Sequence, residues 1–99
     1  MVITKHAEKE KLTLCLQGRL DTTTAPQLEA ELKNSLTDVR ELVFDFTELE
    51  YISSAGLRVL LSAQKVMTRQ GSMVVRGVNG DIMDIFEVTG FSDILTIEK

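Results

Sequence analysis

Apolar and polar residues alternate near the start of the chain. Leu12, Leu14 and Leu16 are separated by more polar residues, which is the pattern of a strand with one buried face. A shorter strand-like run covers residues 2–6, and the polar segment 8–10 lies between the two. We therefore expect a hairpin at the start of the fold.

A helix is expected next, with strand and helix alternating after it. Gly18 is expected to end the second strand. Thr24 and Gln27 fit a capping box, and Pro26 is tolerated in the first turn of a helix. The helix should have one narrow buried stripe, because leucine recurs every fourth residue at Leu28, Leu32 and Leu36.

The second half of the chain continues this alternation. We expect a strand over 41–46, a loop over 47–53, a helix over 55–70 that Gly71 ends, a strand over 72–76, a helix that begins at Asp81 and a last strand over 95–97. The pattern predicts an α/β fold with parallel pairing after the opening hairpin. We expect one domain over residues 1–99, with a small mixed sheet and three to four helices.

Composition narrows the classes of function. The net charge of −4 gives no basic excess, so a nucleic-acid partner is not expected. No apolar run is long enough for a signal peptide or a membrane span, and Cys15 has no second cysteine to pair with. We therefore expect a cytoplasmic protein without membrane insertion. One histidine and one cysteine leave no cluster of metal ligands, and no cofactor is expected.

Two adjacent serines stand where the predicted loop meets the predicted second long helix. Ser54 is expected to cap this helix, since a serine oxygen can accept a hydrogen bond from the first helical turn. The same helix end carries partial positive charge, which would favour a phosphoryl group on a serine there. The residues alone allow two interpretations, namely a simple cap or a site of regulatory modification.

Three segments together resemble the STAS domain, the family of bacterial anti-sigma factor antagonists. The signature-like segment runs from Phe44 through Tyr51-Ile52-Ser53-Ser54-Ala55-Gly56-Leu57. Residues 18–26 resemble the family's first strand-to-helix turn, and residues 77–80 and 86–91 resemble its last helix and flanking loops. The order and spacing of these segments extend the resemblance over nearly the whole chain.

The resemblance implies a function without enzymatic activity. In such systems the unphosphorylated protein binds an anti-sigma factor, which is usually an ATP-dependent serine kinase, and so frees the sigma factor. Phosphorylation then releases the antagonist, and a serine phosphatase resets it. Ser54 matches the family's acceptor position, whereas Ser53 stands where several members have aspartate, so Ser53 stays open as a second acceptor.

The resemblance also implies a partner-binding surface. It places the turn after the second strand beside the phosphorylation site, so the surface comprises Asp21, Thr22, Thr23, Thr24, Ser53, Ser54, Ala55, Gly56 and Arg58. Gly56 either lets the partner's backbone approach or packs the helix start against a strand. Asp21 and Asp45 both follow predicted strands and are expected to reach the same rim as Ser54. The favoured role for Asp45 is to brace the loop 47–53 by accepting backbone hydrogen bonds.

Two other functions stay open. One is a phosphorylation-independent STAS adaptor subunit of a lipid-transport or stress-signalling assembly. The other, more remote, is a serine hydrolase, because Ser54 at a strand-to-helix turn loosely resembles a nucleophile elbow. An activated serine needs a positioned base, and nothing marks His6 as that base.

Overall fold

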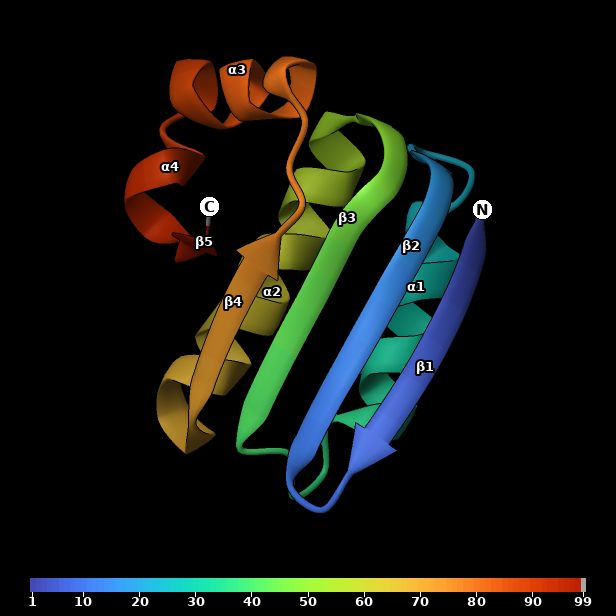
Figure 1. The fold of residues 1–99 in the computed structure, drawn as a ribbon, viewed down its shortest axis with the longest axis vertical. Coiled ribbons are helices and arrows are strands. Elements are labelled where there is room, and N and C mark those ends of the chain that lie inside the picture. Colours follow the sequence, from blue (N-terminus) through green and yellow to red (C-terminus); the bar gives the residue numbers. More distant parts are fainter. Residues whose placement is uncertain (99) are drawn as a thin grey trace.

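One five-stranded sheet carries two long helices on a single face in the computed structural model, which describes residues 1–98 (Figure 1). The strands are β1 (Val2–Glu8), β2 (Lys11–Leu20), β3 (Glu41–Ile52), β4 (Ser72–Arg76) and β5 (Ile97–Glu98). The helices are α1 (Ala25–Ser35), α2 (Ser54–Gln70), α3 (Gly80–Thr89) and α4 (Phe91–Ile94). The predicted mixed sheet and α/β class are confirmed.

The order of the strands explains why one face is covered. The sheet follows the chain, β1-β2-β3-β4-β5, with β1 antiparallel to β2 and all later pairs parallel. Connections between parallel strands are almost always right-handed, so an order that never reverses sends α1 and α2 to the same face. Figure 1 shows both helices behind the sheet, with α3 and α4 beyond β4. Within residues 1–98, no helix covers the other face of the sheet.

The core lies between the sheet and the two long helices. The predicted alternation in β2 holds, since Leu12, Leu14 and Leu16 are buried and their neighbours are not. The stripe on α1 is buried as expected, and α2 contributes a wider apolar face. Residues of the core with almost no exposed surface include Phe44, Phe46, Phe86, Leu28, Leu60 and Met67.

Two strands are longer than the sequence pattern predicts. Gly18 does not end β2; it takes a φ of +101°, the pairing register with β3 shifts after it, and the strand continues to Leu20. β3 continues past Phe46 to Ile52, so most of the expected loop 47–53 is strand. Both extensions pair with each other, which brings the ends of β2 and β3 together.

The predicted capping box at the start of α1 is wrong. Thr24 precedes the helix, but its side chain makes no capping bond. Its hydroxyl instead accepts from the Asp21 N–H at 2.8 Å and donates to the Arg19 carbonyl at 2.8 Å. The amide of Gln27 donates to the Met1 carbonyl at 3.3 Å. The Thr24 hydroxyl therefore bonds within the turn before the helix and does not cap the helix, because that turn offers it both a donor and an acceptor.

Smaller differences concern the later helices. α3 begins at Gly80 rather than Asp81, because the Asn79 side chain accepts from the Ile82 N–H at 2.8 Å and caps it. The last strand covers Ile97–Glu98 and follows the short helix α4. Gly71 ends α2 as expected, and a Cβ there would lie 1.9 Å from the Arg40 carbonyl oxygen.

Among the four helices described, none combines the length and apolar character needed to cross a membrane.

Candidate partner-binding site

The ends of β2 and β3 bring the predicted surface together. Arg19 pairs with Tyr51, Leu20 pairs with Ile52, and the Ser53 N–H donates to the Leu20 carbonyl at 2.9 Å. Parallel strands end at the same edge of a sheet, so the turn after β2 and the start of α2 are neighbours. The structure thus places the turn 21–24 beside Ser53.

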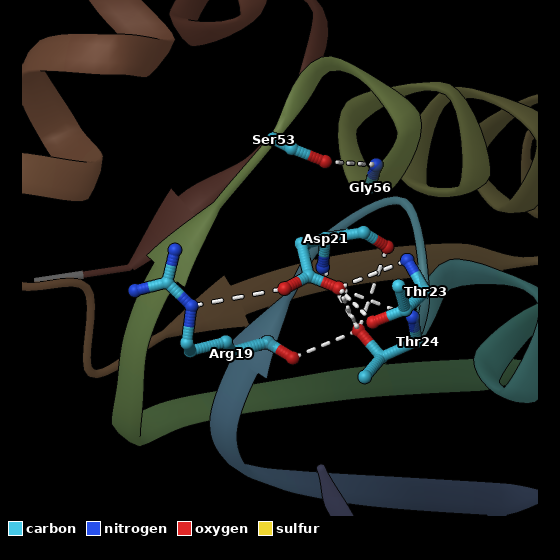
Figure 2. A network of polar contacts seen from close by, with 6 residues as sticks. All are labelled: Arg19, Asp21, Thr23, Thr24, Ser53 and Gly56. Atoms are coloured by element: carbon cyan, nitrogen blue, oxygen red, sulfur yellow. Dashed lines mark hydrogen bonds and ion pairs between the residues drawn. The ribbon is translucent and has the colours of Figure 1, made fainter.

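Ser53, not Ser54, caps α2. Ser53 has extended backbone, and its Oγ accepts from the Gly56 N–H at 3.4 Å (Figure 2). Ser54 is the first residue of the helix and is exposed. The expectation that Ser54 is the cap is therefore wrong by one residue, because β3 runs to Ile52 and leaves Ser53 alone at the junction. The hydroxyl of Ser54 lies at the positive end of the helix without a capping role.

Gly56 fixes the start of α2 against the sheet. It is buried, and a Cβ at this position would lie 2.7 Å from Leu20 Cγ and 2.9 Å from Ile52 Cγ1. Real Cβ atoms do not approach so closely, so a larger residue would have to push these side chains aside. Of the two roles expected for Gly56, the structure shows the packing role; approach of a partner's backbone stays a prediction.

The turn after β2 is held by the carboxylate of Asp21. Its Oδ1 accepts from the Thr23 hydroxyl at 2.7 Å, the Thr23 N–H at 3.0 Å and the Thr24 N–H at 3.2 Å (Figure 2). The Thr23 hydroxyl is the main cause that lowers the pKa of Asp21 below its ordinary value. Asp21 therefore stays ionised near neutral pH and places a negative charge at the edge where α2 begins.

Arg19 and Tyr51 are also part of this edge, although the sequence pattern predicted neither of them as a site residue. The Arg19 guanidinium carbon lies 4.3 Å from the centre of the Tyr51 ring, and its Nε lies 3.7 Å from Asp21 Oδ2. Arg19 and Asp21 flank the buried Leu20 at the end of β2, so their two charges lie on the same side of the chain. Tyr51 could be placed opposite Arg19 only once the register of β2 and β3 was known.

A shallow hollow joins the start of α2 to the start of α1. Thr22, Ala55 and Arg58 line it, and it continues along α1 and α2 to Pro26, Glu29, Val59 and Ser62. Arg58 is exposed one turn beyond Ser54. The residues of the predicted surface thus lie at one end of the molecule, along the turn after β2 and the first turns of α2.

Asp45 does not lie at the edge that carries Ser54 and the turn 21–24. It is in the middle of β3, where it pairs with Cys15 on one side and Arg76 on the other, so the expectation that it shares the rim with Ser54 is wrong. Its Oδ1 accepts from the Thr47 hydroxyl at 2.6 Å and the Thr47 N–H at 3.0 Å, and its Oδ2 lies 3.6 Å from Arg76 Nε. The bonds from Thr47, hydroxyl first, lower the pKa of Asp45. The expected bracing role is therefore seen, but it is confined to the strand.

The geometry does not support a hydrolase built on Ser54 and His6. His6 pairs with Thr13 near the start of β2, whereas the serines adjoin its end at Leu20. Seven residues of strand separate these positions by roughly 23 Å, at about 3.3 Å per residue. A general base must lie within hydrogen-bond reach of the serine. Within residues 1–98, no three His, Cys, Asp or Glu side chains gather in a way that could hold a metal ion.

Comparison with known proteins identifies the family. The sequence pattern of the STAS domain matches residues 2–99. This chain belongs to the STAS domain family. This chain is 41% identical over 88 residues to BtrV of Bordetella bronchiseptica, and the match covers 87% of this chain and 76% of that protein. It is 33% identical over 99 residues to the anti-sigma-B factor antagonist of Listeria monocytogenes, covering 96% of this chain and 85% of the relative.

Solved structures agree on the fold. The anti-sigma factor antagonist SpoIIAA in its unphosphorylated form superposes with a TM-score of 0.78 at 16% identity, covering 99% of this chain and 88% of SpoIIAA. SpoIIAA in its phosphorylated form gives a TM-score of 0.76 at the same identity, covering 99% and 92%. The arrangement of sheet and helices described above is thus that of known STAS domains.

Proposed function

We propose that this STAS domain is an anti-sigma factor antagonist controlled by phosphorylation of Ser54. The observation that carries the proposal is the exposed Ser54 at the start of α2, with the turn 21–24 beside it. Relatives that share a third or more of its residues support the role, since one is named as an anti-sigma-B factor antagonist. SpoIIAA, which has the same fold, is known in phosphorylated and unphosphorylated forms.

In the proposed cycle the unphosphorylated domain binds an anti-sigma factor and so frees a sigma factor for transcription. The anti-sigma factor is also a serine kinase that supplies ATP and Mg²⁺, and the domain itself is a substrate and not an enzyme. A serine phosphatase removes the phosphate and restores binding. We place this exchange in the cytoplasm, where sigma factors act.

The proposed binding surface comprises Asp21, Thr22, Thr23, Thr24, Ser53, Ser54, Ala55, Gly56 and Arg58. Ser54 is favoured over Ser53 as the acceptor for two reasons. Ser53 is half-buried and its Oγ is engaged by the Gly56 N–H, whereas Ser54 is exposed. A kinase can therefore reach Ser54 without removing the cap of α2.

A phosphate on Ser54 would oppose binding through charge and size. It carries about −1.5 to −2 charges at neutral pH. Burying such a group in an interface without a matched cation costs several kcal/mol, whereas a hundredfold loss of affinity needs only about 2.7 kcal/mol. Ionised Asp21 at the same edge adds repulsion. The helix dipole favours the phosphate within the domain, so the phosphorylated domain should stay folded.

The first experiment identifies the partner and the acceptor. The chain is used to capture its anti-sigma factor from native cells, and mass spectrometry identifies the captured protein. That factor, purified and supplied with ATP and Mg²⁺, should add one phosphate, which peptide mapping should place on Ser54. Ser54→Ala should abolish labelling and Ser53→Ala should retain it. Mapping to Ser53 would overturn the assignment of the acceptor.

Calorimetric titration of both forms against the same factor tests the switch. Phosphorylation of Ser54 should weaken binding at least about a hundredfold, and Ser54→Asp should reproduce the effect only in part, because one carboxylate has less charge and bulk. Circular dichroism should hardly differ between the two forms. Equal affinities would exclude the switch and favour the alternative of a phosphorylation-independent adaptor.

A further inference from the structure

Arg19 is a cation on the edge that carries Ser54, and the proposed function does not use it. Its side chain is 60% exposed, yet it is held from two sides. The Tyr51 ring lies beneath the guanidinium at 4.3 Å, and the Asp21 carboxylate lies 3.7 Å from Nε. Stacking on an aromatic face and pairing with a carboxylate both restrict a long, flexible side chain. Arg19 is therefore more ordered than an ordinary surface arginine.

The two terminal nitrogens of Arg19 remain available. Asp21 approaches the guanidinium at Nε, and within residues 1–98 the guanidinium makes no hydrogen bond to another protein group. The terminal nitrogens carry four N–H donors in a flat fork, which matches the two oxygens of a carboxylate. This fork lies next to the turn 21–24, so a protein bound over that turn and Ser54 would reach it.

We propose that Arg19 binds a carboxylate of the anti-sigma factor and helps to select that partner. The proposal rests on the proposed function, because it names a contact within the same interface. Asp21 and Arg19 then present opposite charges side by side. The bound factor would need an acidic side chain opposite Arg19, and a factor with a basic side chain there would be rejected by repulsion.

A partner's carboxylate is favoured over the phosphate of Ser54 as the anion that Arg19 binds. Figure 2 shows the Asp21 carboxylate next to the Arg19 guanidinium, on the side of the turn 21–24, and Arg19 Nε lies 3.7 Å from Asp21 Oδ2. A phosphate on Ser54 carries about −1.5 to −2 charges, so Asp21 would repel it more strongly than it would repel a single carboxylate of the partner. Arg58 lies on α2, the helix that carries Ser54, and is exposed one turn beyond it, so it is the nearer candidate for a phosphate.

The test measures the affinity of unphosphorylated variants for the anti-sigma factor recovered by capture and mass spectrometry. Arg19→Glu should raise Kd at least about tenfold, or 1.4 kcal/mol, whereas Arg19→Lys should have an intermediate effect because it keeps the charge without the flat fork. Arg69→Glu is the matched control, since it makes the same change of charge on an exposed residue in the last turn of α2. The control should change Kd less than about twofold, because surface charges farther apart than about 8–10 Å are screened at physiological salt.

Charge reversal on the partner separates a direct contact from a structural effect. Each acidic residue on the factor's binding face is changed to lysine in turn. One such change should weaken binding to the wild-type domain and restore binding to Arg19→Glu. If no change restores binding, or if Arg19→Glu matches the control, the inference is wrong while the proposed function stands. If the wild-type domain does not bind the factor, the proposed function itself fails.

The phosphorylated form supplies one more decisive outcome. If Arg19→Glu leaves the affinity of the unphosphorylated domain unchanged and alters only that of the form phosphorylated on Ser54, then Arg19 responds to the phosphate. That result would overturn the assignment to a partner's carboxylate. Thermal melts of each variant should stay close to wild type, because exposed ion pairs contribute only about 0–1 kcal/mol to folding.

Discussion

Ser53 and Ser54 have different surroundings because α2 begins at Ser54 and leaves Ser53 as the capping residue. The hydroxyl of Ser53 caps α2, and that of Ser54 is exposed. The capping bond is long, at 3.4 Å from Gly56 N to Ser53 Oγ, so its contribution should lie in the lower part of the usual range. The division leaves a modifiable residue next to a structural one.

Stability measurements should show this division. Ser53→Ala should lower the free energy of unfolding by about 0.5–1 kcal/mol, since it removes the cap. Ser54→Ala should change the same quantity by less than about 0.5 kcal/mol, as is usual for exposed positions without a special role. Urea denaturation followed by circular dichroism provides the comparison. A larger loss for Ser54→Ala would mean that Ser54 is the cap after all.

At the scale of elements, α2 connects the core to the site. Its buried face packs on β3 and β4, and its first turn is pressed against Leu20 and Ile52 at Gly56. Leu60 lies on the buried face with no exposed surface, whereas Val66 on the same helix is 41% exposed. The two residues allow the packing of α2 to be tested without touching the site.

Leu60→Ala should lower the free energy of unfolding by roughly 2–5 kcal/mol, because it removes buried methyl groups and leaves a cavity. Val66→Ala should cost much less, within about 1 kcal/mol, since much of the valine already contacts water. Thermal melts should rank Leu60→Ala below both Ser53→Ala and Val66→Ala. The opposite ranking would contradict the orientation of α2.

The sequence allowed most elements to be predicted, because alternation in β2 and β4 and the apolar face of α2 follow the expected periods. The continuation of β3 was missed for a physical reason. Between Cys15 and Gln17, and again between Gly18 and Arg19, the register with β3 shifts, so β3 has extra residues. Its buried residues Phe46, Leu49 and Ile52 are therefore three apart, which does not match the period of a strand.

The error in β3 carried over into the site. With the loop assumed to extend to Ser53, either serine could be the cap, since the intrinsic preference is the same for both. The pairing of Tyr51 with Arg19 was hidden by the same shift in register. The resemblance to STAS domains placed the turn 21–24 beside the start of α2, and the parallel pairing of the ends of β2 and β3 is the physical reason that this placement holds.

At the scale of the whole molecule, the two carboxylates with lowered pKa values link folding to pH. Hydrogen bonds from Thr23 stabilise ionised Asp21, and those from Thr47 stabilise ionised Asp45. A carboxylate with a lowered pKa in the folded state binds protons more weakly than in the unfolded state. Its contribution to stability is complete above the unfolded value of about 3.9 and is lost as pH falls through the folded value.

The urea concentration at the midpoint of unfolding should accordingly fall steeply below about pH 4, where Asp21 and Asp45 begin to bind protons in the unfolded chain. Asp45→Asn should make this decline shallower, because one of the linked groups is gone. Asp84→Asn is the control, since Asp84 is exposed on α3 and its side chain makes no hydrogen bond or ion pair within residues 1–98. An equal decline in all three proteins would show that Asp45 does not contribute.

The close fit of Gly56 between Leu20 and Ile52 has a consequence in time. Because Ser54 is exposed in front of this closely packed first turn, adding a phosphate does not require α2 to shift, and the proposed switch needs no slow rearrangement of the domain. In the proposed switch, the phosphate on Ser54 alone then sets the binding state, and hydrolysis of that phosphate restores binding at once. The kinase and the phosphatase would set the rate of the response, and the domain itself would neither slow it nor prolong it.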